Sequence, residues 1–415
     1  MTLNNEQEKA LEQLQRFIKS NKNEILLLGK SGTGKTTVMS EFIKTLSNYN
    51  IAVATLSHKA KTVIRGKIPN VSNVKFHTLA SLLNMKLNME TGDFTEEGKN
   101  PIIQDFDVII IDEMSMLSED VLKLIRKKKS KKCKIVFAGD FRQLPPIGEK
   151  QSALERDIFI SKLELTERVR QQGSSNTILE YSDQYGDAGN NKVNPIRISD
   201  VNIKHYTDFN KVLQDYKKDF EKCLIDPDNI KVVCYRNNTK KQVNAVIREI
   251  IFNKASEIPY QTGDVIIMDN NYQNLLENSQ ELTVISSEMV MEGNYLLYKI
   301  KCLKTNSLDR NSYVLYVLNQ FSVEQHKKDV AELFDKYKKT KNKNVLSEAW
   351  NLKLKYAEVS YNYCMGTHKS QGSGYNKTII LEDDIMKSFM SQKEKNQCMY
   401  VAITRSKEQA IIVKQ

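Results

Sequence analysis

The chain has 415 residues, which is enough for two or three domains with a sizeable hydrophobic core. Its 62 Lys and Arg outnumber its 51 Asp and Glu, and this surplus favours a polyanionic partner, although a basic surface on a soluble protein explains it equally well. No apolar run approaches the roughly 20 residues of a membrane-spanning helix, and residues 1–23 lack the apolar core of a signal peptide, so we expect neither a membrane role nor secretion.

The six cysteines are scattered along the chain, and no two of them form a C-x-x-C pair. This spacing argues against a zinc ribbon and against a disulfide framework. We expect a cytoplasmic protein whose thiols are reduced and serve mostly in packing. The residues are Cys133, Cys223, Cys234, Cys302, Cys364 and Cys398.

The first predicted element is a helix, because Leu11, Leu14, Phe17 and Ile18 recur at helical spacing. Short apolar, β-branched runs then predict strands, and each run is nearly continuous, as is typical of strands covered on both faces of a parallel sheet. Helical patterns between the runs indicate an α/β architecture. The runs are Glu24–Leu28, Ile51–Thr55, Asp107–Ile111, Lys134–Ala138, Ile230–Cys234, Lys377–Leu381 and Gln409–Val413.

Two stretches interrupt this alternation. Residues 85–105 contain the sequence E-T-G-D at 90–93, which is typical of a hairpin turn. Residues 263–350 have shorter, more alternating segments, followed by a Lys-rich helical stretch from His326 to Lys343. The remaining runs fall before residue 140 or after residue 229. The sequence therefore predicts two α/β lobes, residues 1–84 with 106–172 and residues 173–262 with 351–415.

A phosphate-binding loop is predicted directly after the run Glu24–Leu28, where residues 29–36 read G-K-S-G-T-G-K-T. Glycines let backbone N–H groups turn inward around phosphates, and the N-terminus of the following helix adds positive potential. Lys35 can reach the β- and γ-phosphates of ATP, and the Thr36 hydroxyl can ligate Mg²⁺. The residues predicted to hold the nucleotide are Gly29, Ser31, Gly32, Thr33, Gly34, Lys35, Thr36 and Thr37.

An acidic pair, Asp112 and Glu113, follows the buried run Asp107–Ile111. An acidic pair alone is weak evidence, but it gains meaning downstream of a phosphate loop in the same lobe. Asp112 is predicted to hold Mg²⁺, directly or through water. Glu113 is predicted to orient and deprotonate the attacking water.

The run Lys134–Ala138 is followed by the sequence G-D-F-R-Q-L-P-P at residues 139–146. A polar amide at the C-terminal edge of a parallel strand faces the ligand crevice, so Gln143 can sense the γ-phosphate or position water. A simple turn, stabilised by Asp140 and closed by the two prolines, explains the same residues equally well.

With further motifs between Gln7 and Arg405, these residues resemble superfamily 1 DNA helicases of the RecD-like branch, which includes the Dda-type helicases of T-even phages. The resemblance covers nearly the whole chain and fades in the two interrupting stretches. It implies an α/β fold of two RecA-like, parallel-sheet P-loop NTPase lobes. Residues 85–105 then correspond to an inserted β-hairpin, or pin, that splits the duplex, and residues 263–350 to an inserted SH3-like subdomain.

The resemblance also implies further residues at the nucleotide. In L-N-N-E-Q at residues 3–7, Gln7 corresponds to a glutamine that reads the adenine edge. In E-L-T-E-R-V-R at residues 164–170, Arg170 corresponds to an arginine that contacts the γ-phosphate, with Arg168 as its rival. In Y-V-A-I-T-R at residues 400–405, Arg405 corresponds to a second arginine finger. Such fingers typically accelerate hydrolysis by about 10³–10⁵.

Contacts with DNA are implied at several positions. The segment 366–373 resembles the motif in which Thr367 and Lys369 bind phosphate, while Gln371 and Gly372 shape the turn. The chain departs from the family pattern at Gly374, where Ser or Thr is usual, and at Leu56, where Pro is usual. His77 is favoured as an exposed stacking partner for a base, while a buried core position explains Phe76 equally well. The implied DNA-binding residues are Ser57, His58, Phe76, His77, Asn237, Thr367, His368 and Lys369.

The activity implied by the resemblance is that of an ATP-dependent DNA helicase that moves 5′→3′ on single-stranded DNA as its lobes open and close. ATP and Mg²⁺ are the implied cofactors, and single-stranded DNA and forked duplex DNA are the implied partners. Single-strand-binding or replisome proteins are candidate further partners, and we expect a monomer in the cytoplasm, or in the host cytoplasm for a phage protein. The alternatives are an RNA helicase or nucleoprotein remodeller of the same superfamily, a binding module without catalysis, and a metabolic P-loop kinase.

Overall fold

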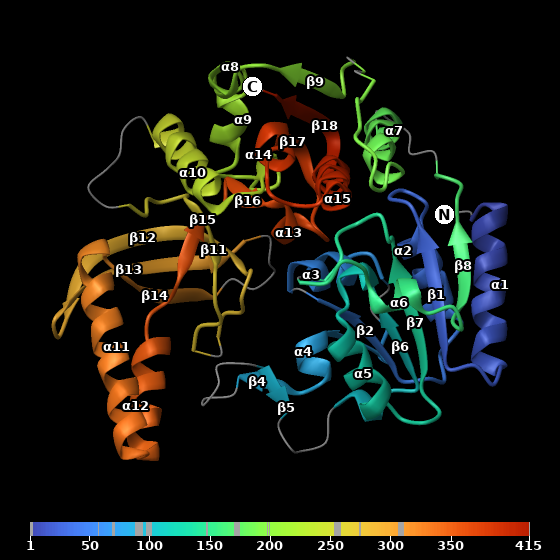
Figure 1. Ribbon diagram of the computed structural model, residues 1–415, viewed down its shortest axis with the longest axis horizontal. Coiled ribbons are helices and arrows are strands. Elements are labelled where there is room, and N and C mark those ends of the chain that lie inside the picture. The colour runs from blue at the N-terminus through green and yellow to red at the C-terminus, as the bar shows by residue number, and fades with distance from the viewer. Residues whose placement is uncertain are drawn as a thin grey trace.

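The structure is a computed structural model. It describes residues 3–56, 58–68, 71–87, 94–96, 102–146, 148–169, 175–196, 198, 200–252, 259–273, 275–305 and 311–414. A six-stranded parallel sheet, a five-stranded parallel sheet and a five-stranded antiparallel sheet lie side by side in the molecule (Figure 1). We call the six-stranded sheet with its helices the first lobe, and the five-stranded parallel sheet with its helices the second lobe. The predicted α/β fold of two parallel-sheet lobes is confirmed.

The first lobe is a parallel sheet with the strand order β3-β2-β6-β7-β1-β8. Its four inner strands match the four runs predicted before residue 140, while the edge strands β3 and β8 were not predicted. An edge strand is covered on fewer sides, so its burial alternates and no continuous apolar run appears. The strands are β1 (Glu24–Gly29), β2 (Ile51–Thr55), β3 (Val74–Thr78), β6 (Val108–Ile111), β7 (Lys134–Gly139) and β8 (Ser161–Leu165).

Helices cover both faces of this sheet, and each face has its own hydrophobic cluster. The predicted first helix, α1, begins with a capping box formed by Asn4 and Gln7, and it buries Leu14 and Phe17. The helices of this lobe are α1 (Asn5–Lys19), α2 (Lys35–Lys44), α3 (His58–Arg65), α4 (Leu79–Leu82), α5 (Glu119–Lys128) and α6 (Ala153–Arg156), with short 3₁₀ turns η1 (Ile102–Asp105) and η2 (Met114–Met116).

The second lobe has the strand order β16-β10-β17-β18-β9, again with all neighbours parallel. Helices α7, α14 and α15 contribute to the cluster on one face, while α8, α9 and α10 contribute to the other. The strands are β9 (Ile203–Tyr206), β10 (Ile230–Cys234), β16 (Cys364–Gly366), β17 (Tyr375–Leu381) and β18 (Ser406–Val413). The helices are α7 (Ser175–Gly186), α8 (Phe209–Asp215), α9 (Lys217–Lys222), α10 (Asn237–Phe252), α13 (Thr367–Ser370), α14 (Glu382–Met386) and α15 (Gln392–Thr404).

The antiparallel sheet has the order β14-β13-β12-β11-β15 and lies beside the second lobe (Figure 1). It continues past residue 350, the predicted end of this insertion, because β15 pairs with β11 at the sheet edge. Its strands are β11 (Val265–Met268), β12 (Glu281–Glu292), β13 (Tyr295–Lys304), β14 (Ser312–Leu318) and β15 (Val359–Tyr361). Two helices, α11 (Gln320–Thr340) and α12 (Lys343–Leu354), lie between β14 and β15 in the chain.

A short antiparallel pair, β4 (Met85–Leu87) and β5 (Phe94–Glu96), occupies the predicted pin segment, while its turn at 90–93 lies outside the described residues. All six cysteines are buried and unbridged, and the sulfur atoms of Cys234 and Cys364 lie 3.5 Å apart. None of the helices in the described part of the chain combines the length and apolarity that crossing a membrane requires.

Candidate nucleotide site between the lobes

The predicted phosphate loop connects β1 to α2. Gly32 and Gly34 both have positive φ angles, +84° and +82°. A Cβ atom at Gly34 would lie 2.2 Å from the Gln7 amide nitrogen, so both backbone conformation and space require glycine there. The loop ends at Lys35, Thr36 and Thr37, which form the first turn of α2 and place its N-terminus at the loop.

Lys35 lies against the loop itself. Its ammonium group donates to the carbonyl oxygens of Gly29 (2.6 Å) and Lys30 (3.1 Å). Burial lowers the pKa of Lys35, and the negative charges of Asp140, Asp112 and Glu113 oppose this shift. Those three carboxylates follow β7 and β6, so the parallel sheet brings them to the same edge as the phosphate loop.

Asp112 and Glu113 follow β6 as predicted. Burial and the neighbouring charge of Glu113 raise the pKa of Asp112. A bound cation would favour the charged form of such a carboxylate. Carboxylate and hydroxyl oxygens are ligands that Mg²⁺ accepts, so Asp112 and Thr36 are chemically suited to the ion. Glu113 has a left-handed backbone, φ 56°, an uncommon conformation that clusters at functional sites.

The segment after β7 forms the turn that was one of the two interpretations of Gln143. Asp140 accepts from the backbone N–H of Arg142 (3.0 Å), and the Gln143 N–H donates to the Asp140 carbonyl (3.1 Å). The Gln143 side chain is buried, and its oxygen has no hydrogen-bond partner among the described residues. The turn therefore leaves this amide oxygen free to meet a further donor.

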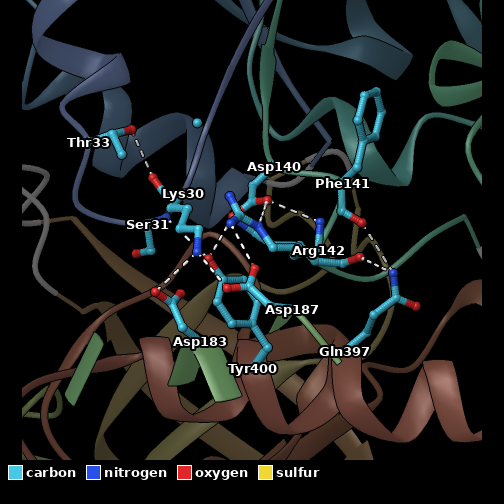
Figure 2. A network of polar contacts seen from close by, with 12 residues as sticks. Lys30, Ser31, Thr33, Asp140, Phe141, Arg142, Asp183, Asp187, Gln397 and Tyr400 are labelled. Carbon is cyan, nitrogen blue, oxygen red and sulfur yellow. Dashed lines mark hydrogen bonds and ion pairs between the residues drawn. The ribbon is translucent and has the colours of Figure 1, made fainter. Parts of the chain in front are cut away.

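Helix α15 of the second lobe reaches the phosphate loop directly (Figure 2). The Tyr400 hydroxyl donates to Asp140 (2.6 Å) and accepts from the backbone N–H of Ser31 (3.2 Å). The Gln397 amide donates to the carbonyl oxygens of Gln143 (2.8 Å) and Phe141 (3.3 Å). The turn after β7 is therefore bonded to the second lobe as well as to the first.

Ion pairs with two carboxylates, in α7 and directly after it, add to the contacts between the lobes (Figure 2). Lys30 contacts Asp187 (2.7 Å) and Asp183 (3.3 Å), and Arg142 contacts Asp187 (3.3 Å). Partly exposed pairs of this kind are worth roughly 1 kcal/mol or less each. Sequence analysis missed Asp183, Asp187 and Gln397, because no local motif signals a partner in the other lobe.

Gln7, predicted to read adenine, is buried and bonded to the protein. Its amide nitrogen donates to the Thr33 carbonyl (3.0 Å), and its oxygen accepts from the Asn4 backbone N–H (3.1 Å). The Thr33 hydroxyl in turn donates to the Lys30 carbonyl (2.9 Å). In this structure Gln7 supports the phosphate loop through these contacts.

Arg405 is buried at the C-terminal end of α15. Its guanidinium donates to the carbonyl oxygens of Val401 (3.1 Å) and Ser373 (3.0 Å) and to the Thr404 hydroxyl (3.0 Å). Burial lowers the pKa of Arg405, and the charge of Glu113 opposes this shift, so the two groups interact across the lobe boundary.

Arg170 and its rival Arg168 are the two candidates for the other arginine contact with the γ-phosphate. Arg170 lies outside the described residues. Its rival Arg168 donates to Asp183 (2.7 Å) and to the Leu179 carbonyl (3.3 Å). Arg168 is thus bonded to α7, and its Nε atom is buried without a partner in the described part of the chain.

Three of the predicted DNA contacts lie on α13. Thr367 is fully buried and its hydroxyl donates to the Cys234 carbonyl (3.0 Å), so the predicted phosphate contact by this hydroxyl is corrected to an internal one. Lys369 is exposed and pairs with Asp269 (3.0 Å), while the half-buried His368 lies 6.2 Å from the Tyr235 ring. Asn237 is exposed at the start of α10.

Of the predicted DNA contacts on the first lobe, the structure describes the side chains of Phe76 and His77. Ser57 lies outside the described residues, as does the side chain of His58, which begins α3. Phe76 is partly buried against the core. His77 is half-buried rather than exposed, because its ring packs edge-to-face on Phe106 at 5.5 Å.

Comparisons with known proteins agree with this arrangement. Residues 2–192 match the protein family described as AAA domain. An uncharacterized protein of Acanthamoeba polyphaga mimivirus is 24% identical, and the alignment covers 98% of each chain. The ATP-dependent DNA helicase dda of Enterobacteria phage T4 is 23% identical over 97% of each chain. The ATP-dependent DNA helicase Pif1 of Campylobacter jejuni is 24% identical over 92% of this chain and 86% of that protein.

Two solved structures of Pif1 helicases have a similar fold. One, from work on DNA unwinding at forked duplex DNA by two coordinating Pif1 helicases, has a TM-score of 0.57 at 17% identity and covers 100% of this chain and 92% of that one. The other, Bacteroides Pif1 in complex with ADP-AlF3 and single-stranded DNA, has a TM-score of 0.54 at 16% identity, with 99% and 92% covered. At this identity the likeness establishes the fold, two RecA-like lobes with an added antiparallel sheet.

Proposed function

We propose that this chain, which belongs with the Dda-like and Pif1-like helicases of superfamily 1, is an ATP-dependent DNA helicase that moves along single-stranded DNA. One observation carries the proposal. The phosphate loop of the first lobe contacts the second lobe through Tyr400, and Glu113 of the acidic pair lies near Arg405 and Gln371 of the second lobe. A nucleotide bound at that boundary touches both lobes, so its hydrolysis can change how they sit together.

The residues at this boundary divide the chemistry between them. Lys35 and the N–H groups of the loop hold the phosphates, and Glu113 takes a proton from the attacking water. Mg²⁺, held by Thr36 and Asp112, offsets the phosphate charge when bound. Arg405, with Arg170 as the second finger, stabilises the charge that develops on the γ-phosphate. Gln143, whose side-chain oxygen has no hydrogen-bond partner among the described residues, helps to place the water.

Lobe movement follows from the same contacts. The second lobe already bonds to the loop through the Tyr400 hydroxyl at Ser31 and through the ion pair of Asp187 with Lys30, which is individually weak. ATP binds the closed arrangement best because it adds contacts on both sides, and loss of the γ-phosphate removes that preference. If the two lobes alternate in their grip on the strand, closing and opening become directional steps.

The DNA track runs over both lobes in this proposal. Lys369, His368 and Asn237 provide polar contacts on the second lobe, and Phe76 and His77 provide rings on the first. Phosphate contacts dominate such a track, so binding should weaken strongly with salt and depend little on sequence. We also propose 5′→3′ movement, on the resemblance to Dda-type enzymes.

Unwinding of tailed duplexes tests this proposal. DNA duplexes with either a 5′ or a 3′ single-stranded tail are incubated with the protein, with and without ATP and Mg²⁺, and strand separation is followed by fluorescence. We expect ATP-dependent separation of the 5′-tailed duplex and little of the 3′-tailed one. Equal action on both tails, or a preference for the 3′ tail, would overturn the direction. Matched RNA duplexes that are unwound faster than DNA would favour an RNA helicase instead.

Replacement of Arg405 tests its proposed role as an arginine finger. Arg405→Lys keeps the positive charge but cannot reproduce the planar set of donors, so we expect the DNA-stimulated kcat to fall at least about tenfold. Arg405→Ala should also lower thermal stability, because buried acceptors left unpaired cost about 1–3 kcal/mol each. Binding to single-stranded DNA, measured by fluorescence anisotropy, should change little in Arg405→Lys. A folded Arg405→Lys protein with full turnover would remove Arg405 from the mechanism.

A further inference from the structure

The loop Gln371–Ser373 follows α13 of the second lobe and contacts the first lobe. The Gln371 amide nitrogen lies 3.5 Å from the Glu113 carboxylate and 3.3 Å from the Ser115 hydroxyl. The Gln371 side chain is buried, and its oxygen has no hydrogen-bond partner in the described part of the chain. The sequence predicts a turn-shaping role for Gln371, whereas the structure directs its side chain to the predicted general base.

The next two residues of the loop fix its position between the lobes. Gly372 has a φ of +75°, and a Cβ atom there would lie 3.0 Å from the Cβ of Ala60 on α3 of the first lobe. The Ser373 carbonyl accepts from the Arg405 guanidinium at 3.0 Å. One short loop therefore contacts the first lobe and two of the predicted catalytic side chains, Glu113 and Arg405.

On its other side the loop continues from α13, which is firmly anchored. The Thr367 hydroxyl donates to the Cys234 carbonyl (3.0 Å), and the Ser370 hydroxyl donates to the Thr367 carbonyl (2.7 Å). The exposed Lys369 on this helix is one of the proposed DNA contacts. Because α13 is bonded internally and is only four residues long, a shift of the helix moves Gln371 with it.

Glu113 needs such a partner. Its backbone is left-handed, and the side-chain donor that its carboxylate has in the described residues is Gln371. A base must be held within hydrogen-bond reach of its water, and small displacements of catalytic groups cost large factors in rate. At 3.5 Å the contact is at the long limit of a hydrogen bond, so a small closing movement would strengthen it.

We infer that Gln371 is a positioning residue, which holds the Glu113 carboxylate in place when the lobes close. Through this contact, the position of α13 affects the rate of ATP hydrolysis. The inference rests on the proposed function. The base is then complete only when the second lobe contributes its amide. DNA bound along α13 raises the rate of hydrolysis by fixing Gln371 against Glu113.

The test compares Gln371→Met with the unchanged protein in steady-state ATP hydrolysis, with and without single-stranded DNA. Methionine has a similar shape and cannot donate the hydrogen bond. We expect the DNA-stimulated kcat to fall about tenfold, as for loss of one hydrogen bond to a charged group. The KM for ATP and the Kd for single-stranded DNA should stay within about twofold. This split between kcat and binding would not arise from a general loss of structure.

Ser115→Ala is the matched control, because it removes the other acceptor of the Gln371 amide and leaves Glu113 in place. If Gln371 acted only by anchoring the loop to Ser115, this variant would reproduce the defect; we expect it to retain turnover within about twofold. If Gln371→Met does not fold, Gln371→Glu replaces it, and that variant should lose at least as much kcat because two carboxylates would face each other.

The outcomes separate the inference from the proposed function. If the unchanged protein shows no DNA-stimulated hydrolysis, the proposed function fails. If it is stimulated and Gln371→Met is stimulated equally, Gln371 does not position the base. A rise in KM or Kd that accounts for the whole defect, or an equal defect in Ser115→Ala, would also overturn the inference.

Discussion

Lys35→Ala is expected to lower ATP hydrolysis at least about 100-fold, with or without DNA, because it removes the cation that stabilises the phosphates as their charge shifts. The Lys35 ammonium is held at the loop by the carbonyl oxygens of Gly29 and Lys30, beside three carboxylates. Without nucleotide-driven closure, strand separation should be lost as well. Phosphate release and unwinding of a tailed duplex measure the two effects.

Lys30→Ala is the matched control for this variant, since it removes an equal charge from the same loop. The Lys30 side chain pairs with Asp183 of α7 and with Asp187, which directly follows that helix. We expect its hydrolysis to stay within severalfold of the unchanged protein, on the order of the loss of a partly exposed ion pair. Normal hydrolysis by Lys35→Ala would place the nucleotide elsewhere on the chain.

The sequence was most informative where the chain is most buried. Ile51–Thr55 and Ile230–Cys234 were predicted with their observed limits, because an inner strand of a parallel sheet is apolar on both faces. The edge strands Val74–Thr78 and Ser161–Leu165 were missed, since polar residues alternate with buried ones. A strand as short as Cys364–Gly366 gives too few residues for any period to appear.

At the candidate site, the sequence located groups that follow each other along the chain and missed partners that meet only in space. Lys35, Asp112 and Glu113 carry local patterns, and parallel strand ends bring them to one edge. The contacts of Tyr400 with Asp140 and of Gln371 with Glu113 span more than 250 residues of chain, and only the docking of the lobes creates them. Thr367 and Gln7 were predicted from motifs to contact ligands, but in the structure their side chains donate hydrogen bonds to backbone carbonyl oxygens of the protein.

The two lobes contribute different groups to the candidate site. The first lobe holds the phosphate loop and the predicted base, while the second contributes Gln371, which follows α13, and Arg405, which follows α15. The catalytic groups of the proposed function are thus divided between the lobes. In the proposed function, ATP is therefore hydrolysed when the lobes are closed. Any ligand that favours closure raises the rate of hydrolysis.

Glu113→Gln separates binding of ATP from its hydrolysis. Glutamine has nearly the same shape as glutamate but cannot take a proton, so we expect kcat to fall about 10²–10⁴-fold. The affinity for ATP should be kept or increased, because Lys35 and the loop are unchanged and one negative charge near the phosphates is removed. Equilibrium binding of a fluorescent ATP analogue and single-turnover hydrolysis measure the two quantities independently.

Glu12→Gln provides the isosteric control, since Glu12 is exposed on α1 and pairs at the surface with Arg16 at 3.6 Å. Its kcat should equal that of the unchanged protein. Gln371 could still donate to the new amide oxygen in Glu113→Gln, so the position of the side chain should be preserved and the loss should come from proton transfer itself. If Glu113→Gln kept normal turnover, another group would have to accept the proton, and the coupling through Gln371 would have no base to act on.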